Sequence, residues 1–218
     1  MICGVDEAAR GPVIGPLVVA GVTFKDESIL IKNNVRDSKQ ITPKRREKLE
    51  SIIKEYADDF ALISISASDI DDMRKVMTLN EIEVNAFIKV IQKLKPTICY
   101  VDSADVNDKR FGYNILSRLT FKTEIISKHK ADMIYPIVGA ASILAKTYRD
   151  REILKIEQEL KKKLNMPLGS GYPADPVTKK FLKIWVKKYK KLPPHTRHSW
   201  KTSQKLLQED KIRKLDEF

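Results

Sequence analysis

The sequence predicts an α/β fold in which helices cover a central sheet. Short apolar segments rich in Val and Ile, typical of buried strands, alternate with longer segments whose apolar residues repeat at helical spacing. Strands separated by helices are characteristic of a layered α/β architecture. The 218 residues, 42% of them hydrophobic, are enough for one large domain or two small ones with a substantial core.

The first third of the chain is expected to form two strands and a helix. The expected strands are Met1 to Val5 and Leu17 to Phe24, and two Gly-Pro pairs between them mark turns. Thr42 and Pro43 then begin a helix, because Thr is a favoured N-cap and Pro suits the first helical position.

The middle of the chain continues this alternation. A helix is expected to begin at Thr78, where Glu81 completes a capping box, and to end before Pro96. The other expected elements are strands at Phe60 to Ile65, Ile98 to Val101 and about Thr120 to Ser127, and helices at about Lys109 to Leu119 and Ile134 to Leu164.

The last part of the chain has a different composition. Residues 151–218 hold 18 basic and 8 acidic residues, so they carry +10 of the net charge of +12. Beyond the loop that begins at Gly169, Asp175 caps a Lys-rich helix that reaches Tyr189, and a final helix begins near Ser199. We place a domain boundary after residue 168. The charge indicates either a surface that attracts a polyanion or a solvated, lysine-rich face of a heat-adapted protein.

Several classes of protein are excluded. The two cysteines form no C-x-x-C pair, which excludes a zinc ribbon and a disulfide framework. The apolar runs are too short to span a bilayer, and no secretory signal begins the chain, so we expect a soluble, cytoplasmic protein without membrane contact. The sequence contains no P-loop, G-x-S-x-G or G-x-G-x-x-G motif.

Acidic residues stand beside apolar segments at three places. Asp6 and Glu7 follow the first strand, Asp102 ends the strand at 98–101, and Asp132 precedes an apolar helix. Ligands of α/β sheets gather at the carboxyl ends of strands, and converging carboxylates repel unless a hard cation such as Mg²⁺ binds them. The pattern favours two-metal phosphodiester hydrolysis. The alternative, that these acids are helix caps and surface charges, stays open.

Six motifs, in this order along the chain, resemble those of ribonuclease HII, the type 2 ribonuclease H, and of its archaeal branch in particular. They are residues 5–16 (VDEAARGPVIGP), 37–40 (DSKQ), 100–105 (YVDSAD), 129–132 (HKAD), 140–146 (AASILAK) and 169–176 (GSGYPADP). The resemblance implies an RNase H-like mixed sheet flanked by helices at 1–168, with a small, basic helical region at 169–218 that binds substrate.

The resemblance also implies roles for individual residues. Asp6, Glu7, Asp102 and Asp132 match the family's metal-binding catalytic carboxylates, and the implied cofactor is Mg²⁺ or Mn²⁺. The residues that match substrate-binding positions are Ala9, Arg10, Gly11, Lys39, Lys146 and Tyr172. Arg10 and Gly11 match two-thirds of a Gly-Arg-Gly motif that reads the ribonucleotide 2′-hydroxyl, whereas Ala9 stands where the family has the first glycine.

The implied reaction is endonucleolytic hydrolysis 5′ to a ribonucleotide, which leaves a 3′-hydroxyl and a 5′-phosphate. The implied partners are RNA–DNA hybrids and ribonucleotide-containing duplexes, bound by a monomer. Residues 212–218 weakly resemble a tail that binds a sliding clamp. Two alternatives are a catalytically weak protein that binds hybrids or duplexes and a nuclease of the same fold that acts on branched DNA.

Overall fold

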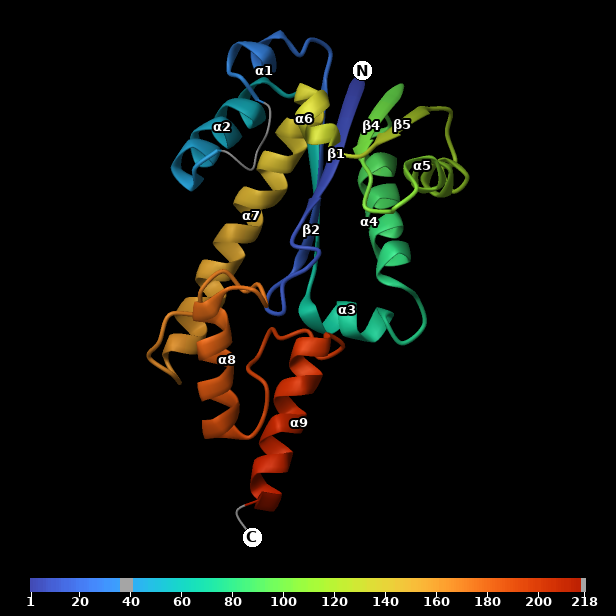
Figure 1. Cartoon of the computed structure of the whole chain (residues 1–218). Coiled ribbons are helices and arrows are strands. Elements are labelled where there is room, and N and C mark those ends of the chain that lie inside the picture. Colours follow the sequence, from blue (N-terminus) through green and yellow to red (C-terminus); the bar gives the residue numbers. More distant parts are fainter. Residues whose placement is uncertain (36–40, 217–218) are drawn as a thin grey trace. The chain divides into compact units, whose positions relative to one another are not determined.

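A five-stranded mixed sheet in the order β3-β2-β1-β4-β5 organises the chain (Figure 1). The computed structural model describes residues 1–35 and 41–216, with side chains to residue 209. Strand β1 is antiparallel to β2 and parallel to β4, and β4 is parallel to β5. The strands are β1 (Ile2–Ala8), β2 (Leu17–Phe24), β3 (Asp59–Ile65), β4 (Ile98–Asp102) and β5 (Glu124–Lys128).

The helices follow the expected alternation with two additions. They are α1 (Ser28–Lys32), α2 (Pro43–Tyr56), α3 (Ala67–Met73), α4 (Leu79–Leu94), α5 (Asp108–Leu116), α6 (Ala131–Ile134), α7 (Pro136–Lys161), α8 (Pro176–Tyr189) and α9 (Lys201–Asp216). The short helices α1 and α3 were not expected from the sequence. The predicted caps at Thr42 and Asp175 and the capping box of Thr78 with Glu81 are confirmed.

Two expected boundaries are wrong. The first strand does not end at Val5, because pairing with β2 continues to Ala8 and carries both acidic residues. The helix expected at 134–164 is two helices, α6 and α7, separated at Tyr135. Tyr135 has an extended backbone, which is the conformation that the following proline, Pro136, favours in the residue before it.

The chain divides into two compact units. Unit 1 comprises Met1–Ala8, Val18–Ser64 and Met77–Tyr148, and unit 2 comprises Ala9–Leu17, Ile65–Val76 and Arg149–Phe218. Helix α7 continues from the first unit into the second. The functional boundary after residue 168 stays a prediction.

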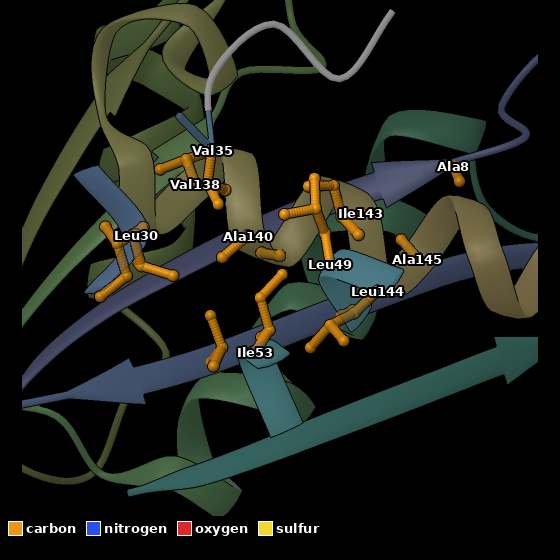
Figure 2. Packing of buried hydrophobic residues seen from close by; sticks show 14 of the residues in the cluster. Ala8, Leu30, Val35, Leu49, Ile53, Val138, Ala140, Ile143, Leu144 and Ala145 are labelled. Carbon is orange, nitrogen blue, oxygen red and sulfur yellow. The ribbon is translucent and has the colours of Figure 1, made fainter. Parts of the chain in front are cut away.

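In unit 1, helices cover both faces of the sheet. A methyl group on Gly4 would collide with the backbone of α7, so this face of β1 packs directly against that helix. On the opposite face, a methyl group on Gly21 would meet Val90 and Leu94 of α4. On the α7 face, residues of α7, β2, α1 and α2 form an apolar core. It includes Val138 and Ile143 of α7, Leu30 of α1, and Leu49 and Ile53 of α2 (Figure 2).

The two cysteines lie opposite each other on neighbouring strands. Cys3 pairs with Cys99 in the parallel register of β1 and β4, and both are buried free thiols. Burial raises the pKa of the Cys99 thiol, and the contact with Cys3 raises it further. Burial keeps both thiols away from reagents in solution.

Unit 2 is built on an apolar cluster shared by α7, α8 and residues 13–14. Phe181 and Trp185 of α8 are buried and Tyr189 packs against the cluster, so these three residues form the apolar stripe of this helix. The opposite face of α8 presents five exposed lysines, which are Lys179, Lys180, Lys183, Lys187 and Lys188.

Asp175 joins α8 to the loop that precedes it. Its carboxylate accepts hydrogen bonds from the backbone N–H of Ser170 (2.6 Å) and of Val177 (2.9 Å). These bonds, with those from the Ser170 and Thr178 hydroxyls, lower the pKa of Asp175 to about 2.

Replacing Asp175 by Asn should weaken the protein at neutral pH and not in strong acid. Because the folded-state pKa lies below its usual value of 3.8, the ionised carboxylate contributes stability above about pH 4 and loses it as the pH falls through about 2. Asn keeps the cap but not the charge, so we expect a loss of about 1 kcal/mol at pH 7. Urea unfolding at pH 7 and pH 2 measures this, and an equal difference at both would contradict it.

No helix in the described part of the chain is long and apolar enough to cross a membrane.

Candidate active site

Two of the predicted carboxylates stand where the parallel pairing of the neighbouring strands β1 and β4 ends. The register pairs Val5 of β1 with Val101 of β4, so Asp6 and Asp102 are the next residues on the two strands. Asp6 is buried and Asp102 is half-buried. The parallel pairing therefore brings together two acids that are far apart in the sequence.

Helix α7 supplies the polar groups that face Asp6. Side chains alternate along a strand, so Asp6 lies on the same face of β1 as Gly4, which touches α7 at Ile137. Two strand residues and five helix residues each advance about 7 Å, which places Ser142 beside Asp6. Ser142 hydrogen-bonds to Asp6, and Lys146 donates to the Ser142 hydroxyl at 2.8 Å.

Asp132 is brought to the same place by the turn before α7. The backbone N–H of Ala131 donates to Asp102 Oδ1 at 2.8 Å, which ties the start of α6 to the end of β4. Lys130 makes the turn with a left-handed backbone, φ 56°. Asp132, the next residue after Ala131, is buried and acts electrostatically on Asp6.

The cluster holds more negative charge than its surroundings neutralise. Burial, the charge of Asp102 and, more weakly, the charge of Asp132 together raise the pKa of Asp6 from 3.8 to about 7, against the opposing effects of Ser142 and Lys146. A nearby cation would stabilise the ionised form of such a buried carboxyl group.

These residues fit a divalent metal ion by their chemistry. Carboxylate oxygens are the donors that Mg²⁺ and Mn²⁺ prefer, and mutual repulsion is the effect that such an ion relieves. No three acidic, His or Cys side chains in the described residues already stand in coordinating positions.

One predicted residue is placed differently, and one lies outside the part of the chain that the structure describes. The backbone N–H of Glu7 donates to Asp6 Oδ1 at 2.7 Å, but strand alternation directs the half-buried Glu7 side chain from the other face of β1. Lys39 lies outside the described residues.

The remaining predicted residues gather in unit 2. A methyl group on Gly11 would stand 3.8 Å from the ring of Tyr172, so the loop at 9–11 lies beside that ring. Backbone hydrogen bonds from Val13 (2.8 Å) and Ile14 (3.2 Å) to the carbonyl of Gly171 join the two loops. The Tyr172 side chain is exposed, and the Arg149 guanidinium lies 5.0 Å from its ring centre.

Ala9 adopts a left-handed backbone, with φ 69°. A residue with a Cβ atom pays about 1–2 kcal/mol for this conformation, whereas glycine does not. Ala9 therefore holds, with backbone strain, a left-handed conformation that glycine would adopt without strain.

Sequence reasoning missed three residues that the structure places at these sites. Ser142 gave a weak signal, a polar residue in an apolar helix four positions before Lys146. Arg149 and Arg197 gave none, because they are two among the 41 basic residues of the chain.

The fold and the site together define a class of protein. A mixed sheet with acidic residues where the parallel pairing of β1 and β4 ends, and a third acid from the turn before α7, is the framework of a metal-dependent nuclease of the ribonuclease H type.

Comparison with known proteins gives the family. The model of the ribonuclease HII family matches residues 3–203, and the chain belongs to this family. Ribonuclease HII of Methanosarcina barkeri is 47% identical and that of Pyrococcus abyssi is 45% identical, with matches that cover 96% and 100% of this chain and 96% of each relative. The chain is accordingly a metal-dependent endoribonuclease that cleaves RNA in RNA–DNA hybrids and ribonucleotides embedded in DNA.

Solved structures agree with the fold. The crystal structure of ribonuclease H2 from Pyrococcus horikoshii OT3 matches with a TM-score of 0.88 at 42% identity, over 96% of this chain and 98% of that one. A ribonuclease HIII, Bst-RNase HIII, in complex with Mn²⁺ matches with a TM-score of 0.76 at 18% identity, over 97% of this chain and 70% of that one, which shows the common fold.

Proposed function

We propose that Asp6, Glu7, Asp102 and Asp132 hold the catalytic Mg²⁺ or Mn²⁺, with Glu7 approaching the ion from the other face of β1. The observation that carries the proposal is the parallel register of β1 and β4, which sets Asp6 beside Asp102, together with the bond from the Ala131 N–H to Asp102, which brings Asp132 to the same place. The Mn²⁺ bound to the related ribonuclease HIII supports the choice of metal. Such an ion supplies activation of the attacking water and stabilisation of the leaving 3′-oxygen.

The chain's own residues prepare the site for this chemistry. Ser142 and Lys146 hold the Asp6 carboxylate in place. The N–H of Ala131 donates to Asp102 Oδ1 and so fixes the orientation of this carboxylate. Lys146 also carries a charge that attracts the substrate phosphate once the cation neutralises Asp6.

In unit 2, we propose that residues 9–11 and Tyr172 recognise the ribonucleotide. Gly11 is exposed beside the Tyr172 ring, so a sugar stacked on the ring would meet the backbone of this loop. The exposed lysines of α8 provide phosphate contacts, which should make hybrid affinity fall steeply with salt.

The proposal is tested by cleavage of two labelled substrates, a hybrid with a continuous RNA strand and a DNA duplex with one ribonucleotide. We expect cleavage of both in Mg²⁺ or Mn²⁺, on the 5′ side of the ribonucleotide in the second. Cleavage that persists after removal of divalent ions would overturn the proposed metal site.

Replacing Ala9 by Gly should change substrate choice. Glycine removes the strain at φ 69° and the methyl group near the ribose, so we expect cleavage at a lone ribonucleotide to rise about threefold to tenfold, with continuous RNA little affected. The ratio of the two kcat/KM values measures the effect. An equal change on both substrates would show that the methyl group is tolerated.

We also propose that residues 212–218 bind a sliding clamp. Ribonuclease HII from Archaeoglobus fulgidus, 40% identical with a TM-score of 0.83 over 94% of this chain and 96% of that one, was solved in complex with PCNA. The side chains of this tail lie outside the described residues. Removing residues 211–218 should abolish clamp binding and leave cleavage of short substrates unchanged, as titration calorimetry and the cleavage assay would show. Unchanged clamp affinity would dispose of the proposal. The monomeric state and the cytoplasmic location stay predictions.

A further inference from the structure

One buried arginine holds the loop that follows β1. The Arg197 side chain is fully buried and donates to three backbone carbonyls of residues 9–15. Its Nη2 reaches Ala9 at 2.7 Å, its Nη1 reaches Arg10 at 2.9 Å and its Nε reaches Gly15 at 3.0 Å. A guanidinium shared among carbonyls in this way fixes the path of the loop, since its donors are coplanar.

Neighbouring groups hold the arginine and the loop in turn. The backbone N–H of Arg197 donates to the carbonyl of Val13 at 2.8 Å, and the Trp200 ring centre lies 4.8 Å from the guanidinium. Trp200 Nε1 donates to the carbonyl of Gly11 at 3.3 Å. Residues 197–200 thus contact four carbonyls in the segment 9–13.

These contacts set the direction of the loop's N–H groups. In a trans peptide the C=O and the following N–H point in opposite directions. Because Arg197 draws the carbonyls of Ala9 and Arg10 toward itself, the N–H groups of Arg10 and Gly11 point away from it. These are the backbone groups suited to contact a 2′-hydroxyl.

We propose that Arg197 is a positioning residue for ribonucleotide recognition, which it serves by holding Ala9 in its left-handed conformation. This inference rests on the proposed role of residues 9–11. The strain at Ala9 favours relaxation of the loop, and the hydrogen bond from Nη2 to the Ala9 carbonyl opposes it. Arg197 therefore matters more in a chain with alanine at position 9 than in one with glycine.

The test is a double-mutant cycle of Arg197→Lys and Ala9→Gly, read as the ratio of kcat/KM on a single-ribonucleotide duplex to kcat/KM on a continuous RNA–DNA hybrid. Lys cannot bond to three carbonyls at once, so we expect Arg197→Lys to lower this ratio about tenfold, or about 1.4 kcal/mol. Adding Ala9→Gly should recover at least about threefold beyond the effect of Ala9→Gly alone. The matched control is Arg151→Lys, at an exposed site of α7, which should leave the ratio unchanged.

Other outcomes separate the possible failures. If Arg197→Lys lowers both activities equally and glycine recovers neither, Arg197 is only structural and the inference fails. If Arg197→Lys does not fold, Trp200→Phe replaces it in the cycle, since it removes the bond to Gly11 and leaves a smaller ring against the Arg197 guanidinium. An unchanged ratio would then overturn the inference that the contacts of residues 197–200 position the loop.

Gly11→Ala tests the loop itself. If Gly11→Ala lowers the ratio and Arg197→Lys leaves it unchanged, the role of Arg197 is rejected and the proposed recognition loop is kept. An unchanged ratio for both would reject the loop as well.

Discussion

Replacing Asp6 by Asn should lower turnover on an RNA–DNA hybrid by about a thousandfold or more, equal to about 4 kcal/mol of transition-state stabilisation. Asn keeps the shape and the hydrogen-bonding capacity toward Ser142 but lacks the charge that would hold the metal ion. The fold should survive, because the variant removes a buried charge that Asp102 already disfavours. Steady-state cleavage in Mg²⁺ and in Mn²⁺ measures the loss.

Stability gives an independent check on the same variant. The folded-state pKa of Asp6 is raised above 3.8, so the metal-free protein pays for the ionised carboxylate at pH 8, above both the folded and unfolded values. Asp6→Asn should therefore unfold at a urea concentration no lower than wild type when divalent ions are absent. The exposed Asp72→Asn serves as the control and should cleave normally. Turnover near wild type in Asp6→Asn would remove Asp6 from the proposed site.

Replacing Gly4 by Ala should destabilise unit 1 by about 3 kcal/mol or more. The new Cβ atom would overlap the carbonyl of Ile137 and stand 2.6 Å from the N of Val138, both backbone atoms of α7. A helix backbone cannot yield as a flexible side chain does, so α7 must shift as a whole. Because α7 also carries Ser142 and Lys146, the shift should reduce activity together with stability.

Gly11→Ala is the matched control for stability, since a methyl group there meets only the Tyr172 ring at an ordinary 3.8 Å. The free energy of unfolding in urea should change by less than about 1 kcal/mol for this variant. Equal losses for the two variants would show that the close approach of β1 and α7 is not what requires glycine at position 4.

Helix starts were predictable because their signals are local. Thr42 accepts from the N–H of Arg45, Thr78 exchanges hydrogen bonds with Glu81, and Asp175 accepts from Val177. Each bond joins residues two or three positions apart, so the residue types alone reveal it. The strands with buried apolar runs were found for the same reason.

The extent of β1 was not predictable in this way. Asp6 and Glu7 are poor strand formers by type, yet pairing with Ala20 and Val19 of β2 holds them in the sheet. The acids were recognised as candidates because they follow an apolar strand. Their meeting with Asp102 depended on the parallel register of β1 and β4, a property of the sheet rather than of either segment.

The sequence by itself determined the α/β class, the helix caps, the basic last third and the acids that belong to the proposed metal site, because these depend on residue type and short spacing. Only the tertiary structure decided that Ser142 faces Asp6, that the backbone of Ala9 is left-handed and that Arg197 donates to the Ala9 carbonyl. The bond from Arg197 to Ala9 joins residues 188 positions apart. No local pattern encodes such a bond, because its partner is a backbone carbonyl that every residue possesses and only folding brings the two together.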